Sequence, residues 1–136
     1  MGIMKAHSEL LSTAEDIRQL AEKLQGAPII AFDTEFIRES TFFPVIEILQ
    51  IATDSESWLV DARAFKSRGD LEGIRPLLDL LGDPKILKVV HAAQGDQECL
   101  YTSFGVVASP TIDTAIAASV CGYGDGIGLG NLLKAA

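Results

Sequence analysis

Residues 29–35 read IIAFDTE, and this stretch decides how the chain is expected to fold. Its apolar start predicts a buried β-strand at residues 29–33, and two carboxylates lie at the C-terminal end. Successive side chains of a strand point to opposite faces, so Asp33 and Glu35 would converge while Thr34 turns away. Two adjacent carboxylates repel each other unless a cation or a shared proton lies between them. The spacing therefore raises the hypothesis of a metal site, although acidic residues also follow strands as loop starters or helix N-caps.

The composition indicates one compact domain covering residues 1–136. Of these residues 48% are hydrophobic, and the mean hydropathy is +0.26, which argues against disorder. No apolar run approaches the roughly 20 residues of a membrane helix, so we expect no membrane partner, and no secretory signal is recognisable. Cys99 and Cys121 lie in apolar surroundings that predict buried free thiols and a reducing, cytoplasmic location.

The net charge of −8 argues against binding nucleic acid through bulk electrostatics. Carboxylates that ligate a metal count as negative in this sum but are neutralised in the working protein. The charge therefore still allows a local, metal-bearing site that meets a phosphate chain.

Hydrophobic periodicity predicts an α/β fold with a mixed sheet. We expect strands 29–33, 45–52 and 58–60 to be antiparallel neighbours, because their connections are short. A crossover helix over 71–81 allows the strand at 86–90 to lie parallel to the first. Three other helices are expected. The first begins at a capping box in residues 12–15, the second covers 92–104, and the third covers 114–120 with Asp113 as its N-cap.

Asp96 falls in the first turn of the helix expected at 92–104. If the strands at 29–33 and 86–90 are neighbours, this residue lies beside Asp33 and Glu35. It is then either an ordinary acid at a helix N-terminus or a third carboxylate of the same site.

Three weaker features have plainer interpretations. We expect His7 to lie in a mobile N-terminus and Asp61 to be structural or exposed. The glycine-rich run at 122–128 lacks the ending of a phosphate-binding P-loop, and we interpret it as a flexible loop before a short helix.

Several motifs together resemble a known family. FDTEF at 32–36 resembles the first motif of the DEDD family of 3′–5′ exonucleases, and HAAQGD at 91–96 looks like the second. TFFP at 41–44, ILQIA at 48–52 and IDT at 112–114 are similar to segments of its ribonuclease D branch. The resemblance implies a ribonuclease-H-like fold, in which a mixed sheet of three antiparallel strands followed by parallel strands is flanked by helices. It also implies hydrolysis at the 3′ end of single-stranded RNA or DNA, with RNA favoured.

The resemblance assigns Asp33, Glu35 and Asp96 as catalytic ligands of two divalent cations, Mg²⁺ or Mn²⁺. Two such ions, about 3.5–4 Å apart, can clamp a phosphodiester so that one activates water and the other stabilises the leaving oxygen. Asp33 would bridge both ions, Glu35 would hold the ion nearer the water, and Asp96 would support the other through water.

The resemblance also implies a set of substrate contacts. Phe36 would stack near the 3′-terminal base, a contact that any base can make, or would simply pack in the core. Gln50 would touch the terminal nucleotide or bond within the sheet, and His91 would contact substrate or be a satisfied, half-buried histidine. Thr34 completes the predicted substrate-binding set.

The third family motif, Tyr-x-x-x-Asp, does not occur before Ala136. Tyr101 and Tyr123 do not fit it, because residues 105 and 127 are Gly and Ile. We therefore expect three ligands where four are needed, and weak or absent activity in this chain alone.

A family helix that packs over the sheet is also expected to be missing. Its absence would uncover an apolar patch around Leu129, Leu132 and Leu133, which favours self-association. Two alternatives stay open, namely a non-catalytic nucleic-acid or protein interaction module of the same fold and an unrelated metal-dependent phosphohydrolase.

Overall fold

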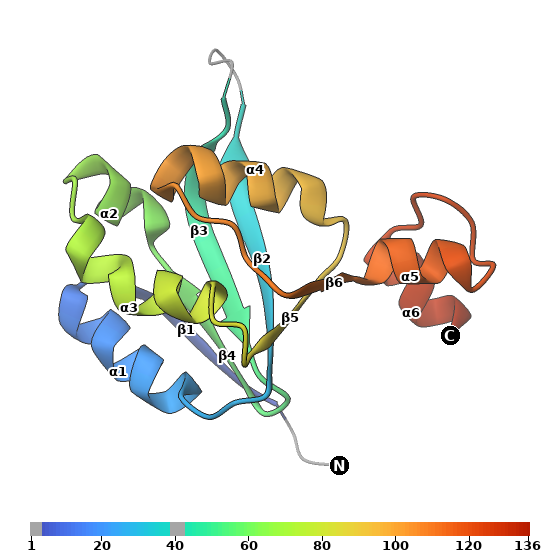
Figure 1. Cartoon of the computed structure of the whole chain (residues 1–136), viewed down its shortest axis with the longest axis horizontal. Helices are drawn as coiled ribbons and strands as arrows, with labels where there is room; N and C mark the ends of the chain where they lie inside the picture. Colours follow the sequence, from blue (N-terminus) through green and yellow to red (C-terminus); the bar gives the residue numbers. More distant parts are fainter. Residues whose placement is uncertain (1–3, 39–42) are drawn as a thin grey trace.

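Strands and helices alternate along most of the chain, and the computed structural model describes residues 4–38 and 43–136. In chain order the elements are β1 (Lys5–Leu11), α1 (Ala14–Leu24), β2 (Ile29–Ile37), β3 (Val45–Ala52), β4 (Glu56–Val60), α2 (Ala62–Ser67), α3 (Leu71–Leu81), β5 (Leu87–Val90), α4 (Ala93–Phe104), β6 (Thr111–Asp113), α5 (Thr114–Val120) and α6 (Leu129–Ala135). The strands form one sheet in the order β1-β4-β3-β2-β5-β6. Helices α1 to α4 lie over the sheet, and α5 and α6 lie to its side beyond β6 (Figure 1).

The strand directions match the predicted mixed sheet. Strands β2, β3 and β4 form an antiparallel meander, and β5 pairs with β2 in parallel. Strand β6 continues the parallel half of the sheet beside β5. The α/β, ribonuclease-H-like fold expected from the sequence is therefore confirmed.

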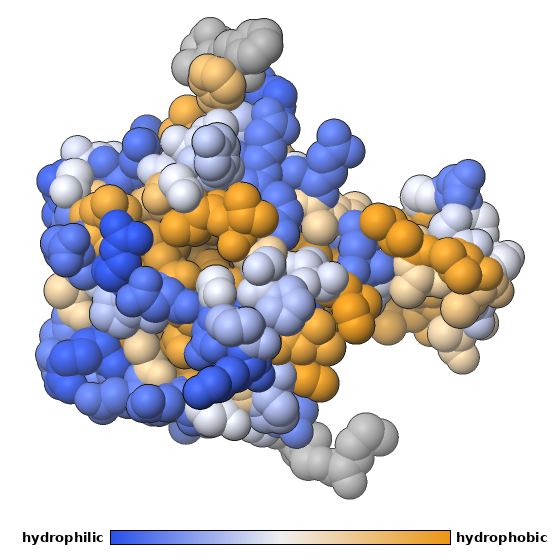
Figure 2. Space-filling model, viewed as in Figure 1, coloured by the Kyte–Doolittle hydropathy of each residue, from blue (hydrophilic) through white to orange (hydrophobic). Residues whose placement is uncertain are grey.

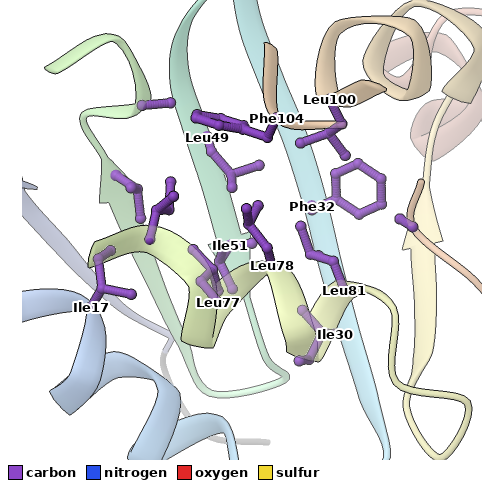
Figure 3. Close-up of a cluster of buried hydrophobic side chains, with 14 of the residues drawn as sticks. Ile17, Ile30, Phe32, Leu49, Ile51, Leu77, Leu78, Leu81, Leu100 and Phe104 are labelled. Carbon is purple, nitrogen blue, oxygen red and sulfur yellow. The ribbon is translucent and has the colours of Figure 1, made fainter. Parts of the chain in front are cut away.

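The core lies between one face of the sheet and the helices that cover it. Along β2 the alternate residues Ile30, Phe32 and Thr34 are buried, whereas Asp33 and Glu35 between and after them are exposed. Figure 3 shows Ile30 and Phe32 facing the leucines of α3 and the apolar side of α4. Burial of this face fixes the register of the strand, because a slip of one residue would bury the carboxylates instead.

Helix α1 begins one residue later than the sequence suggested. Its N-cap is Thr13, whose Oγ1 accepts from the backbone N–H of Asp16, while Asp16 accepts from the N–H groups of Ser12 and Thr13. The capping box expected at residues 12–15 was therefore wrong by one position. Glu15 instead bonds to Arg18, one turn along the same helix.

The prediction that His7 lies in a mobile N-terminus was wrong. It belongs to β1, which pairs in parallel with β4, and its ring stacks on Trp58 with centroids 5.6 Å apart. Its Nε2 also lies 2.7 Å from a carboxylate oxygen of Glu56. The strand was missed because its polar sequence, KAHSELL, forms a largely exposed sheet edge without an apolar alternation.

Two other expectations have mixed outcomes. Asp61 is structural as predicted, since it caps α2, a six-residue helix that the periodicity did not reveal. Cys99 is buried as expected, but Cys121 is exposed at the end of α5, where no layer of the described chain covers it. No helix in residues 4–38 and 43–136 is long and apolar enough to span a membrane.

Strand β6 and helices α5 and α6, together called the C-terminal unit here, expose much of their apolar surface. Ala118 is the one buried residue of α5, and α6 has none. Ile116, Val120 and Leu133 are 65%, 84% and 70% exposed. Figure 2 shows apolar side chains gathered along this unit, away from the helices that cover the sheet.

Candidate active site

The two carboxylates of the opening motif lie within β2 and not after it. The strand extends to Ile37, four residues beyond its predicted end, because β3 continues to pair with it. Asp33 lies opposite Gln50 and Glu35 opposite Ile48 in that antiparallel pair. The pairing holds both acids on the strand just before its register shifts between Glu35 and Phe36, and both are exposed on the face away from the core.

Asp96 lies in the first turn of α4 and is only 5% exposed. Its Oδ1 accepts a hydrogen bond from the backbone N–H of Thr34 at 3.0 Å and another from the Thr34 hydroxyl. Strand β5 pairs with β2 only as far as Ala31, which leaves the Thr34 N–H free for this contact. Thr34 therefore points under α4 and fixes the Asp96 carboxylate against the strand.

The Asp96 carboxyl is held in an environment that resists its negative charge. Burial raises the pKa of Asp96 above its ordinary value, and the hydrogen bonds from Thr34 oppose that rise only in part. The neighbouring Asp33 carboxylate raises the pKa of Asp96 further. The structure thus brings Asp33 and Asp96 together, and a cation between them would relieve this repulsion.

Glu35 does not complete a three-carboxylate cluster. Among the residues that the structure describes, no three His, Cys, Asp or Glu side chains form a group able to hold a metal ion. The donor set of Asp33, Glu35 and Asp96 nevertheless has the chemistry that Mg²⁺ and Mn²⁺ favour, because all its ligand atoms are carboxylate oxygens.

Phe36 lies against the beginning of α4. A Cβ added at Gly95 would come within 3.2 Å of Cζ of Phe36, so a larger residue at position 95 would displace the ring. Phe36 is 36% exposed, which leaves part of its ring open beside the carboxylates. Glycine at position 95 was not singled out from the sequence, since only the folded chain shows how closely the ring approaches.

A hollow of about 420 Å³ opens on the same side of the sheet as Asp33. Asp33, Gln50, His91 and Leu129 contribute to its lining, together with small apolar residues of β2, β3 and β5. Gln50 is exposed, and its side chain makes no hydrogen bond to the described part of the chain. The hollow thus combines an apolar floor with free carboxylate and amide groups.

Both ring nitrogens of His91 are used inside the protein. Nε2 donates to the carbonyl oxygen of Ile127 at 2.7 Å, and Nδ1 lies 2.8 Å from the hydroxyl of Thr114. His91 therefore ties the end of β5 to α5 and to the loop before α6.

Asp113 has a larger part in the site than its sequence position suggested. It caps α5 as predicted, with Oδ1 accepting from the N–H of Ala115. The same carboxylate also accepts from the N–H groups of Ala92 and Ala93, where α4 begins. Spacing along the chain gave no sign of this second role.

The aromatic-proline stretch at 41–44 is only partly described. Thr41 and Phe42 lie outside the described residues. Phe43 is 57% exposed where the chain enters β3, on the same hairpin as Phe36.

Comparison with known proteins identifies the family of this arrangement. A family model described as 3′-5′ exonuclease matches residues 9–136. Ribonuclease D of Nitrobacter hamburgensis is 36% identical over 128 residues, which cover 93% of this chain and 32% of that protein. Ribonuclease D of Gluconacetobacter diazotrophicus is 39% identical over 126 residues, covering 91% of this chain and 30% of that protein.

A solved structure agrees with these sequence matches. Escherichia coli RNase D, described as an exoribonuclease involved in structured RNA processing, superimposes with a TM-score of 0.82 and 29% identity. The match covers 94% of this chain and 32% of that one, so the chain spans about a third of the length of its relatives. With its fold, its acidic strand and its sequence all in agreement, the chain belongs to the 3′–5′ exonuclease family and is similar to ribonuclease D.

Proposed function

We propose that this chain carries the acidic site of a 3′–5′ exonuclease that hydrolyses phosphodiester bonds at the 3′ end of single-stranded nucleic acid. The observation that carries the proposal is the pair of hydrogen bonds that holds the buried Asp96 carboxylate of α4 against Thr34 of β2, the residue next to Asp33. RNA is the favoured substrate, because the similar Escherichia coli protein is an exoribonuclease. The family match over residues 9–136 also supports a single exonuclease domain in this chain.

Exonucleases of this family depend on divalent metal ions, and we assign Asp33, Glu35 and Asp96 as the ligands of two Mg²⁺ or Mn²⁺ ions. When bound, the ions would activate water and stabilise the leaving oxygen. The protein's own contribution is to hold Asp96 through Thr34 and to keep Asp33 exposed toward the substrate side. Burial of Asp96 also keeps its carboxylate in one orientation, which limits the reorganisation needed at the site.

Phe36 and Gln50 are the strongest candidates for contacts with the 3′-terminal nucleotide. The Phe36 ring is partly open, and the Gln50 amide is free in the hollow beside Asp33. The substrate contacts of Thr34 and His91 stay predictions. The polar side-chain atoms of both residues already make hydrogen bonds within the protein. Both can influence the substrate by positioning other groups.

The activity is tested with a 5′-labelled single-stranded RNA, Mn²⁺ and the 136-residue chain. We expect progressive shortening from the 3′ end, which stops on addition of EDTA or in Asp33→Asn. Asp54→Asn is the matched control, because Asp54 is an exposed acid in the β3–β4 turn. Equal shortening of an RNA blocked at its 3′ end would contradict the exonuclease assignment, and a DNA of the same sequence measures the preference for RNA.

A non-catalytic binding module is the second candidate. The observation that favours it is that Glu35 does not close a three-ligand group with Asp33 and Asp96 among the described residues. The module would be supported if the chain binds Mn²⁺ and RNA but does not shorten the RNA at equal concentrations of protein and RNA. That result would exclude hydrolysis by this chain alone.

We also propose that the C-terminal unit mediates self-association with a second copy of the chain. Leu129 and Leu133, two residues of the predicted patch, are 48% and 70% exposed, and Val120 adds a further exposed apolar side chain. Sedimentation analysis should show a dimer that Val120→Lys weakens, whereas a monomer at all concentrations would contradict the proposal. A cytoplasmic location is proposed as well, on the ground that both cysteines are free thiols.

A further inference from the structure

Helix α4 begins without a cap of its own. Its N-cap residue, Ala92, has a left-handed backbone with φ 58° and ψ 61°, and no side chain there accepts a hydrogen bond. An alanine in this conformation is uncommon and is held only where its surroundings fix it. The first N–H groups of the helix still need an acceptor.

Asp113 supplies that acceptor from a neighbouring strand. Its Oδ1 accepts from the N–H of Ala92 at 2.9 Å, and its Oδ2 accepts from the N–H of Ala93 at 2.8 Å. The pairing of Val90 with Asp113 between β5 and β6 sets the carboxylate beside the turn where α4 starts. One side chain thus fixes both the strained residue and the first residue of the helix.

The same carboxylate also holds α5, through the N–H of Ala115 at 2.9 Å. Partial burial opposes ionisation of Asp113, but the backbone N–H groups outweigh it and lower the pKa of this carboxyl below its ordinary value. Asp113 is therefore a charged link between two helix N-termini, and one of these helices carries Asp96.

Asp96 lies one turn into α4, so the position of the helix start determines where its carboxylate lies. The carboxylate is fixed at one end by Thr34 on β2, and its backbone is fixed at the other end by Asp113. Loss of the hydrogen bonds to Asp113 would let the first turn of α4 shift relative to β2. The Asp33–Asp96 approach depends on that turn.

We infer that Asp113 is a positioning residue of the exonuclease site, which sets Asp96 against Asp33 by capping α4 from β6. The inference rests on the proposed metal role of Asp33 and Asp96. Asp113 itself touches neither acid and acts through the backbone of residues 92 and 93.

The test compares Asp113→Asn with Asp61→Asn in the complete chain. Asp61 caps α2 by the same chemistry, accepting from the N–H of Ala64 at 3.1 Å, but α2 carries no residue of the proposed site. Amide hydrogen exchange of Thr34 reports the bond to Asp96 without any metal. We expect exchange at Thr34 to be about 10-fold faster in Asp113→Asn and unchanged in Asp61→Asn.

Mn²⁺ titration provides the second measurement. Loss of a group that orients a ligand typically weakens metal binding by about 10- to 100-fold, so we expect a loss in this range for Asp113→Asn and none for Asp61→Asn. If Asp113→Asn fails to fold, Asp113→Ser keeps a short acceptor for α5 but cannot reach both helices, and the same changes are expected.

Unchanged Thr34 exchange in a folded Asp113 variant would overturn the inference. The proposed metal site would be contradicted instead if the wild-type chain does not bind Mn²⁺, or if Asp33→Asn does not weaken the binding. Thr34 exchange would still decide whether Asp113 positions Asp96, so the two failures are distinguishable.

Discussion

Helices α3 and α6 are both leucine-rich, yet their environments are opposite. In α3, Ile74, Leu77, Leu78 and Leu81 are at most 2% exposed, because α1 and the sheet cover them. In α6 no residue is buried, and Leu133 is 70% exposed. An apolar helical pattern therefore predicts the helix, whereas its burial depends on which other elements are present to pack against it.

A substitution among the buried residues of α3 has the largest expected effect on the free energy of unfolding. Leu77→Ala removes a fully buried side chain between α3 and the sheet, and such changes cost about 2–5 kcal/mol in the free energy of unfolding. Urea unfolding followed by circular dichroism measures the loss. A cost below about 1 kcal/mol would mean that this part of the core is loosely packed and would weaken the contrast with α6.

Lys88 links β5 to the segment that leads into the C-terminal unit. It is fully buried in β5, and its Nζ donates to the carbonyl oxygens of Asp83, Ile86 and Ser109 at 2.6, 2.7 and 2.9 Å. Lys88→Met would remove the side-chain donor of all three carbonyls, although that of Asp83 also accepts from the backbone N–H of Ile86, and the expected cost is about 2–3 kcal/mol. Urea unfolding measures it.

The exposed Lys85 gives the matched control for this link. Lys85→Met should change the free energy of unfolding by less than about 0.5 kcal/mol, because its side chain lies in solvent. Equal stability of Lys88→Met and the wild-type chain would show that the buried ammonium does not hold β5 to the segment before β6.

Asp113 provides a second link, and its contribution should depend on pH. Partial burial opposes its charge, but the N–H groups of residues 92, 93, 115 and 116 lower the pKa of Asp113 in the folded chain below the unfolded value of about 3.9. The stabilisation is therefore complete above that value and is lost as the pH falls through the folded pKa.

Asp113→Asn should accordingly cost about 1 kcal/mol at pH 7, a usual size for an N-cap. The difference from the wild-type chain should stay constant down to about pH 5 and shrink below about pH 4. Urea unfolding at a series of pH values measures it. A difference that grows on acidification would show that the charge of Asp113 is not stabilising.

Most of the fold could be predicted because its central elements have strong patterns. The strand at 45–52 and the helices at 71–81 and 114–120 were predicted with their observed bounds. Strands β1 and β6 and helix α2 were missed because a polar edge strand, a three-residue strand and a six-residue helix contain too few apolar positions to show a period. Lys88 was also missed, since lysine is rarely buried and local sequence does not reveal three convergent carbonyls.

The placement of Asp33 near Asp96 could be predicted from the sequence, whereas the contacts of these residues could not. Asp33 and Asp96 are close, as the parallel pairing of β2 with β5 implied. The alternation that turns Thr34 away from Asp33 was also expected, but its hydrogen bond to Asp96 was not. Such bonds depend on where α4 crosses the strand, which is a property of the packed chain and not of local spacing. The metal and substrate roles of these residues stay predictions.

A substitution in the exposed helix α6 has the smallest expected effect. It distinguishes an α6 that a second copy covers from an α6 that packs against its own chain. Leu133→Ala should change the free energy of unfolding of the monomer by less than about 0.5 kcal/mol, because the side chain is already mostly in solvent. Urea unfolding at low protein concentration measures this, with Leu77→Ala as the buried reference. At high concentration the same variant should lose stability only if a second copy covers α6, since association stabilises the folded state by mass action. A large loss at every concentration would instead mean that α6 packs against its own chain, and the contrast between α3 and α6 would disappear.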